Sequence, residues 1–292
     1  MLNILIVTIS LEKSAGYEKN EGKINVYNYN SPEKPVAYKI VDKAHEITPY
    51  FSKEGNLLIW AQAFMDKSNQ SYYGEHVLLY LDMNKWWLKR VPTYKGPIHD
   101  ISWSPDGKHF IVISGFMPGG SVLFDKDCVP KYEFGKHHRN TIKWSPLGRF
   151  VCLAGYGNLS GDMEIWDTFS LVKMGTCKSS SAVSCQWSPD GRKIMTGVLN
   201  PRLRVDNNYR IFKYNGESLN TVDFGHSELY EVLWRPGQYQ DRPPSPSKKV
   251  EVKEEAKKVF RPKGSGAFAA QLKKDRGETN QGRFLNPNEF FQ

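Results

Sequence analysis

A five-residue motif, WSPDG, constrains the fold of this chain more than any other feature, because it recurs at nearly regular intervals. It occupies residues 103–107 and returns as WSPLG at 144–148 and as WSPDG at 187–191. Degenerate copies are FSKEG at 51–55 and WRPG at 234–237. Successive copies start 41 to 52 residues apart. Repeats of roughly 40–50 residues built from short apolar strands are typical of the blades of a β-propeller.

The motif also has a physical reason to form a turn. An aromatic residue at the end of a strand fills the core, proline presets φ for a tight turn, and glycine supplies the positive φ from which the next strand starts. We therefore expect each copy to join the first two strands of a blade.

The segments between the motifs predict four short strands per blade. The clearest unit has strands predicted at 98–104, 108–115, 120–125 and 130–134. Two later units repeat this order, at 140–145, 149–155, 162–167 and 172–176, and at 183–188, 193–198, 209–214 and 219–224. Earlier strands are predicted at 2–9, 23–29, 37–41, 46–52, 57–64, 76–81 and 86–91. A last strand is predicted at 229–235, with no blade after it. The sequence thus predicts an all-β chain with about five WD40-like blades over residues 1–237.

Composition changes after residue 237. A proline-rich stretch at 241–247 predicts an extended linker, and 267–274 could form about two turns of helix. Residues 238–292 hold 12 Lys and Arg against 7 Asp and Glu, whereas the rest of the chain holds 28 against 24. Such a segment cannot bury enough apolar surface to fold alone. We expect 238–292 to be a basic, largely disordered tail.

The chain carries a formal net charge of +9, which favours an anionic partner, most simply RNA. The four cysteines show no CxxC pairing and no histidine at metal-ligand spacing, so we expect small buried hydrophobes in a reducing compartment. The apolar first nine residues lack the basic start and cleavage site of a secretory signal, and no run has the length of a membrane span. These features predict a cytoplasmic protein with no membrane partner.

We find no catalytic set in the sequence: no GxSxG, no HExxH and no phosphate-binding glycine loop. The pair His99-Asp100 could be half of an acid–base pair, but structural hydrogen bonds at the entry to a blade are the stronger interpretation. We therefore expect no enzymatic activity, no metal and no cofactor.

Two basic sets are candidates for phosphate binding. Lys136, His137, His138 and Arg139 lie in a linker before a blade. Arg202 and Arg204 alternate in a loop, where both guanidinium groups could face one phosphate-bearing partner. The alternative interpretations are that this loop is simply solvated or that its arginines pair with Asp206. Asn158 lies in the corresponding loop of the preceding blade, so one rim of the propeller is predicted to be the binding face. The RNA- or ribosome-binding residues that we predict are Arg139, Arg202 and Arg204 in the loops and Lys248, Lys249, Lys257, Lys258, Lys273 and Lys274 in the tail.

Several strings make the chain resemble a known family. They are YYGE at 72–75, GFMP at 115–118, LAGYGNL at 153–159, MEIWD at 163–167, PRLRVDN at 201–207 and FRP at 260–262. Together they resemble the eukaryotic translation initiation factor 2A family over roughly residues 50–270. The b subunit of initiation factor 3 shares the tryptophan-serine-proline motif with its glycine and a similar arginine-containing loop, but the GFMP string favours factor 2A.

The resemblance implies a large propeller with more blades than this chain supplies, so N-terminal blades would be missing. It also implies a factor that binds the small ribosomal subunit and takes part in delivering initiator methionyl-tRNA without GTP. The messenger RNA and other initiation factors are further implied partners, with the tail serving RNA or protein contacts. The alternative is a WD-repeat scaffold for protein interaction, such as a component like the b subunit of initiation factor 3.

Overall fold

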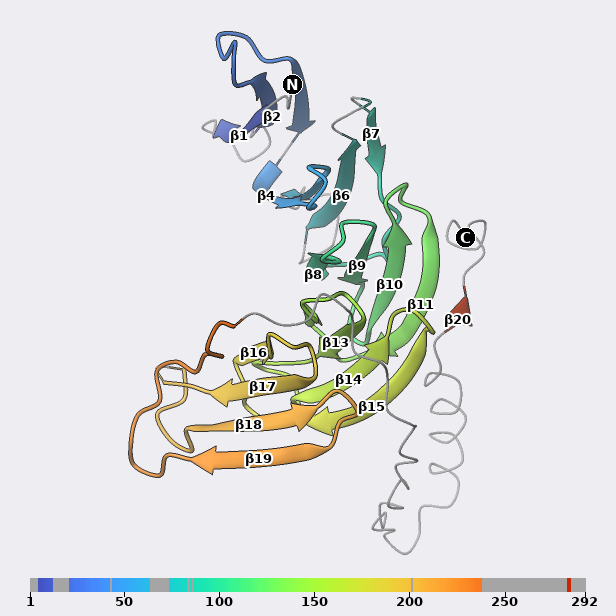
Figure 1. Cartoon of the computed structure of the whole chain (residues 1–292). Coiled ribbons are helices and arrows are strands. Elements are labelled where there is room, and N and C mark those ends of the chain that lie inside the picture. The colour runs from blue at the N-terminus through green and yellow to red at the C-terminus, as the bar shows by residue number, and fades with distance from the viewer. Residues whose placement is uncertain are drawn as a thin grey trace, which may run out of the picture.

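The computed structural model describes residues 5–12, 21–42, 44–63, 74–82, 85, 87–200, 202–237 and 283–284. Every regular element in these ranges is a β-strand, and the sheets follow one another along an arc (Figure 1). Among the same residues, no helical segment has the length and apolarity that crossing a bilayer requires.

The sheets are antiparallel and are built from strands consecutive in sequence. The first contains β1 (Leu5–Glu12), β2 (Glu21–Asn28) and β3 (Ala37–Asp42). The second contains β4 (Ala44–Phe51), β5 (Leu57–Ala63), β6 (Glu75–Asp82) and β7 (Trp87–Arg90). The third contains β8 (Ile98–Trp103), β9 (His109–Ser114), β10 (Gly119–Asp125) and β11 (Pro130–His137), to which β20 (Arg283–Phe284) adds. The fourth contains β12 (Thr141–Trp144), β13 (Phe150–Ala154), β14 (Asp162–Asp167) and β15 (Val172–Lys178). The fifth contains β16 (Ser184–Trp187), β17 (Lys193–Val198), β18 (Asn208–Lys213) and β19 (Ser218–Asp223).

This order confirms the predicted all-β fold of propeller-type blades, with two differences in detail. The first described sheet has three strands. The strand predicted at 229–235 does not form, because no second strand pairs with that segment within the described residues. The predicted helix at 267–274 and most of the predicted tail lie outside the described residues. From the tail the structure describes Arg283 and Phe284, which pair with Glu133 and Tyr132 of β11.

The repeated motif forms the expected turn between the first two strands of a sheet. Gly107, Gly148 and Gly191 have φ of 72°, 73° and 67°, a backbone conformation that glycine adopts at no steric cost. The motif serine fastens each turn. Ser104 Oγ, for example, accepts the backbone N–H of His109 at 3.0 Å and donates to Asp106 Oδ1 at 2.6 Å.

The motif tryptophans link each sheet to the one before it. The indole Nε1 of Trp103 donates to the carbonyl of Tyr50 at 2.9 Å, and that of Trp187 donates to Lys143 at 2.8 Å. Trp144 and Trp234 repeat the bond to Ser102 and Gln186, both at 3.3 Å. In each case the acceptor is the residue immediately before the aromatic residue that begins the preceding copy of the motif. The aromatic residue that begins each motif therefore sets the spacing between neighbouring inner strands, by which we mean the first strands of the second to fifth sheets.

The core lies between neighbouring sheets. Phe150 and Cys152 of β13 face the fifth sheet, while Val151 and Leu153 face the third. Both faces of β13 are thus buried, which explains its uninterrupted apolar sequence. Cys152 is one of four free cysteines. Cys128 and Cys185 are buried like it, as the sequence predicts, whereas Cys177 is only half-buried.

Candidate nucleic-acid interface

One face of the arc collects the loops that sequence analysis proposed as a binding rim. Within each of the second to fifth sheets the second and fourth strands along the chain end on this side, because successive strands are antiparallel. We call it the loop face. It comprises the loops at 91–97, 115–118, 138–140, 155–161, 179–183 and 199–207. The motif turns lie on the opposite side, the turn face.

The loops on this face are tied to one another across sheet boundaries and within sheets. Asn140 links a linker to a neighbouring loop, since its Oδ1 accepts the N–H of Tyr156 at 2.9 Å and its Nδ2 donates to the Tyr156 carbonyl at 3.0 Å. The N–H of Gly115 donates to the Pro97 carbonyl at 2.9 Å. The loop face is therefore a fixed set of backbone positions on which exposed side chains are held.

Arg202 and Arg204 are both exposed on this face. Arg202 Nη2 donates to Asn158 Oδ1 at 3.0 Å, which joins loop 199–207 to loop 155–161 of the preceding sheet. The predicted relation between Asn158 and Arg202 is thus a direct contact. No ion pair joins Asp206 to either arginine in the part of the chain that the structure describes, so the pairing alternative receives no support.

The loop that carries these arginines is held by its own polar side chains. Asn207 Nδ2 donates to the Leu203 carbonyl at 2.6 Å, and Asn207 Oδ1 accepts the N–H of Leu229 at 2.9 Å. Asp206 has a φ of 57°, in the left-handed region that aspartate tolerates better than most residues. These bonds fix the backbone on both sides of Arg204 before any ligand arrives.

Gly157 determines how closely Arg202 approaches its neighbour. Its φ is +72°, and a Cβ built there would lie 3.3 Å from Arg202 Nη2. Glycine adopts this φ without strain, and any other residue would also push the guanidinium a few tenths of an ångström away from its position beside Asn158.

Arg139 does not belong to the exposed set, and the prediction that it contacts RNA is corrected. Its side chain is 2% exposed. Its Nη2 donates to Glu164 Oε2, and its Nη1 lies 3.4 Å from both Ser121 Oγ and the Phe134 carbonyl. Desolvation by burial lowers the pKa of Arg139, and the Glu164 carboxylate opposes this by favouring the charged form. Because its donors are directed inward, Arg139 cannot meet a phosphate in this conformation.

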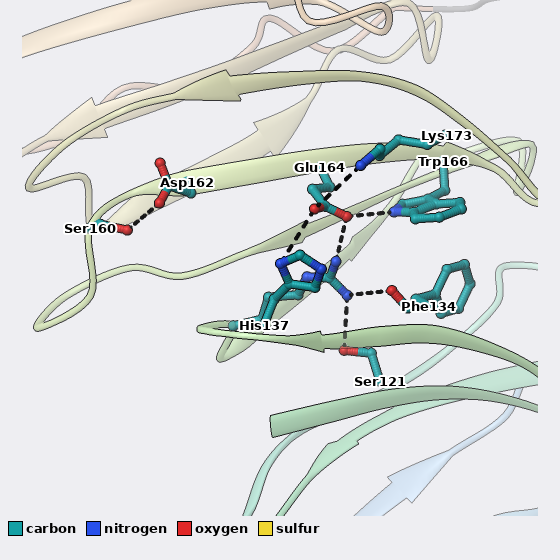
Figure 2. A network of polar contacts seen from close by, with 9 residues as sticks. Ser121, Phe134, His137, Ser160, Asp162, Glu164, Trp166 and Lys173 are labelled. Carbon is teal, nitrogen blue, oxygen red and sulfur yellow. Dashed lines mark hydrogen bonds and ion pairs between the residues drawn. The ribbon is translucent and has the colours of Figure 1, made fainter. Parts of the chain in front are cut away.

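Glu164 is the centre of this half-buried network (Figure 2). Besides Arg139, it accepts the indole Nε1 of Trp166 at 3.2 Å. His137 Nδ1 lies 3.7 Å and Lys173 Nζ 3.8 Å from its Oε1. Burial is the main cause that lowers the pKa of His137, and the charge of Arg139 adds to it. The network joins the third sheet to the fourth and is structural.

Exposed basic and aromatic side chains that the predicted set omitted lie on the same face. Lys136 Nζ lies 4.9 Å from the centroid of the Tyr94 ring, and the Tyr94 hydroxyl donates to Glu133. Lys95 is exposed in the same linker as Tyr94, and Phe116 is 51% exposed on the next loop. Lys136 belongs to the first basic set of the sequence and lies near the end of β11. The signal for Lys95 and Phe116 was position alone, since each lies in a connection that starts or ends at this face.

His99 and Asp100 have structural roles, as the stronger interpretation held. His99 Nε2 lies 2.8 Å from the Gly115 carbonyl. Asp100 accepts the backbone N–H of Ile101 at 2.8 Å and of Ile142, in the next sheet, at 2.6 Å. Burial raises the pKa of Asp100, although both bonds oppose the shift. Among the described residues no three His, Cys, Asp or Glu side chains gather as a metal site.

The predicted tail residues Lys248, Lys249, Lys257, Lys258, Lys273 and Lys274 lie outside the described residues. Arg202 and Arg204 are thus exposed on one loop of the loop face, Lys95 and Lys136 are exposed on the same face, and Arg139 is buried.

Comparison with known proteins identifies relatives of this arc. The family model for eukaryotic translation initiation factor eIF2A matches residues 39–232. Eukaryotic translation initiation factor 2A of Dictyostelium discoideum is 38% identical over 218 residues, which are 74% of this chain and 35% of the relative. The factor of Schizosaccharomyces pombe is 34% identical over 233 residues, 79% of this chain and 40% of the relative. This chain thus spans two fifths or less of the length of these two relatives.

A solved structure described as a crystal structure of the eukaryotic initiation factor superimposes with a TM-score of 0.69 at 28% identity. The superposition covers 80% of this chain and 55% of that chain.

Proposed function

Because this chain belongs to the eukaryotic translation initiation factor 2A family, we propose that it is a noncatalytic platform that binds the small ribosomal subunit, initiator methionyl-tRNA and messenger RNA. Other initiation factors are further proposed partners, and the cytoplasm is the proposed location. GTP is not needed in this proposal, in keeping with the lack of a phosphate-binding glycine loop in the sequence.

The observation that carries the proposal is the arrangement of Arg202 and Arg204. Both are exposed on a loop whose backbone is fixed by Asn207, and Arg202 is oriented by Asn158. Guanidinium groups bind phosphate oxygens through paired donors, and pre-organisation reduces the entropy lost on binding.

Lys95, Lys136 and Phe116 extend the same face with charge and an exposed aromatic ring. Phosphate contacts position an RNA without reading its sequence, and aromatic faces stack on unpaired bases. We propose that the loop face holds an RNA backbone across sheets three to five, with the tail lysines as additional contacts.

The test is co-sedimentation of the chain with small ribosomal subunits over a series of salt concentrations. The double variant Arg202→Ala, Arg204→Ala should bind more weakly. The slope of log affinity against log salt should decrease in magnitude by about 1.5, which is roughly 0.7–0.9 for each phosphate that the variant no longer neutralises.

The matched control is Lys108→Ala, Arg192→Ala. This variant removes the same charge from exposed residues in the motif turns on the turn face. An equal loss in both double variants would mean that net charge, and not the loop face, determines binding, and would reject the assignment.

A scaffold for protein partners is the second candidate, favoured by the exposure of Phe116 and of Val205, which is 63% exposed beside the arginines. Apolar docking depends little on salt, whereas phosphate binding weakens steeply. Binding to ribosomal subunits that persists unchanged at high salt, and is lost in Phe116→Ser but not in the arginine variant, would favour the scaffold.

A further inference from the structure

The loop at 115–118 carries an exposed aromatic ring that its surroundings hold in place. Phe116 is 51% exposed. A Cβ built on Gly96 would lie 3.1 Å from the Cδ2 atom of Phe116 and 2.9 Å from its backbone nitrogen. The phenyl ring therefore packs on the backbone of the linker at 91–97, while about half of the residue faces the solvent.

Hydrogen bonds fix the backbone of this loop on the linker. The N–H of Gly115 donates to the Pro97 carbonyl at 2.9 Å, and His99 Nε2 lies 2.8 Å from the Gly115 carbonyl. Both polar groups of the residue before Phe116 are thus bound to the chain that follows the linker. Because the ring is positioned before any ligand arrives, binding to it costs little conformational entropy.

A second aromatic ring lies against the same loop and holds a lysine beside it. A Cβ built on Gly115 would lie 3.0 Å from Tyr94 Cβ, and one built on Gly120 would lie 2.1 Å from Tyr94 Cε2. The Tyr94 side chain therefore packs against β10 and the loop that precedes it. Gly120 pairs with Lys136 of β11, and Lys136 Nζ lies 4.9 Å from the centroid of the Tyr94 ring. The Lys136 ammonium group is thus held near the loop at 115–118.

The exposed charge around these rings is positive. Lys95, which lies between Tyr94 and Gly96 in the chain, is exposed, as is Lys136. The Glu133 carboxylate, which accepts the Tyr94 hydroxyl, belongs to a residue that is only 6% exposed. An exposed aromatic face accompanied by cations is what single-stranded nucleic acid binds, with bases stacking on the ring and phosphates meeting the cations. The bases of a duplex are stacked on one another and cannot reach such a ring.

We propose that Phe116 is a stacking site for one unpaired base of RNA, and that Lys95 and Lys136 bind the neighbouring phosphates. The inference rests on the proposed function, because it takes RNA as the ligand of the loop face, and it adds that the bound segment is single-stranded. The exposed ring is a small apolar area among charged groups, whereas stable docking of a protein surface requires a much larger contact area. The charge and size of the site therefore favour a nucleotide as its occupant.

The experiment measures binding of the 292-residue chain to one labelled RNA in two forms, by fluorescence anisotropy. The RNA is a strand of about ten nucleotides without internal pairing, a length within the usual range of single-strand binding sites. It is used alone and annealed to its complement. Phe116→Ala should weaken binding of the single strand by roughly five- to a hundredfold and leave binding of the duplex unchanged. Phe116→Tyr, which keeps an aromatic face, should bind the single strand as the wild type does.

The matched control is Phe169→Ala. Phe169 is 65% exposed on the turn face, in the connection between β14 and β15, and the guanidinium carbon of Arg149 lies 5.2 Å from its ring centroid. It is therefore also an exposed ring beside a cation, but on the opposite side of the arc. Phe169→Ala should leave both affinities unchanged. Equal losses in Phe116→Ala and Phe169→Ala would overturn the proposal.

Two further measurements locate the base and the phosphates. A strand with 4-thiouridine at its centre, irradiated on the wild type, should crosslink to the tryptic peptide 109–126, which contains Phe116. The absence of a crosslink to this peptide overturns the site. Lys95→Ala and Lys136→Ala should each reduce the slope of log affinity against log salt by roughly 0.7 for the single strand. Unchanged slopes in both variants would overturn the phosphate contacts.

The same titrations separate failure of this site from failure of the proposed function. If Phe116→Ala binds both RNA forms like the wild type while Arg202→Ala, Arg204→Ala binds both more weakly, the loop face binds RNA but the stacking site is rejected. If the wild type binds neither form, the stacking site and the RNA ligand of the proposed function are rejected together. If Phe116→Ala loses co-sedimentation with small ribosomal subunits but keeps its affinity for RNA, Phe116 contacts a protein, which overturns the stacking site.

Discussion

The indole Nε1 of Trp187 donates to the backbone carbonyl of Lys143, 2.8 Å away and in the neighbouring sheet. The same side chain stacks on Phe150, with ring centroids 6.2 Å apart. One residue therefore supplies both a polar and an apolar contact between the fourth and fifth sheets.

Replacing Trp187 with phenylalanine should lower the free energy of unfolding by about 1–3 kcal/mol, because the Lys143 carbonyl loses its donor and a smaller ring leaves a gap. Urea denaturation followed by circular dichroism measures the change. Trp87→Phe is the control, since Trp87 is 47% exposed and should change stability by less than about 0.5 kcal/mol. Equal effects would show that the indole bond is unimportant.

Replacing Arg139 with methionine should destabilise the chain by about 3–5 kcal/mol, because it leaves the Glu164 carboxylate buried without its main partner. The double variant Arg139→Met, Glu164→Gln should recover part of this loss, since a neutral amide needs less compensation. Urea denaturation of the two single variants and the double variant gives the coupling energy. Additive losses would contradict a direct interaction.

His137 should make stability depend on pH in the mildly acidic range. Its pKa is lowered in the folded chain, while an unfolded histidine has a pKa of about 6.5. Below that value the unfolded state binds more protons, so the free energy of unfolding should decrease as pH falls through about 6.5 toward the lower folded pKa. Above about pH 6.5, His137 is neutral in both states and contributes no pH dependence to the free energy of unfolding. The difference between the wild type and His137→Gln, measured from about pH 7.5 to about pH 5, spans this window, and parallel curves would contradict the assignment.

Gly157→Ala should weaken binding to small ribosomal subunits, though less than Arg202→Ala does, because the new Cβ would lie 3.3 Å from Arg202 Nη2 and would shift the guanidinium by a few tenths of an ångström. The control is Gly55→Ala, since Gly55 has a φ of +88° but no atom within 4 Å of the place that a Cβ would take. Both variants carry backbone strain of about 1 kcal/mol, which thermal unfolding measures. Only Gly157→Ala should reduce binding, and a loss in both would assign the effect to stability.

The repeat was readable from sequence because its determinants are local. A serine, a proline and a glycine within five residues specify the turn, and Gly107 adopts the positive φ that the motif required. The boundaries of β14, Asp162–Asp167, agree with the predicted strand, since a buried strand between two turn signals leaves little freedom.

Arg139 was misassigned because its environment is not local. It belongs to a run of four basic residues, which suggests a solvated surface. Its partner Glu164 lies 25 residues further along the chain. The two side chains meet only because the pairing register of β14 places the Glu164 carboxylate beside the Arg139 guanidinium. Segment 229–235 was misassigned for a related reason. Its pattern is that of a strand, but a strand requires a neighbour.

The two kinds of contact between sheets give the arc an uneven stiffness. Sheets three and four are fastened at the inner strands by Trp144 and at the loop face by the Arg139–Glu164 pair. Two separated attachments resist rotation of one sheet against the other, so these two sheets should move as one rigid body. Phe51 has no indole N–H to donate to a sheet before it, and the side chains described between β2 and β5 meet there by apolar packing. Applied force should therefore bend the arc first at the boundary between β3 and β4, which becomes the mechanical hinge of the molecule.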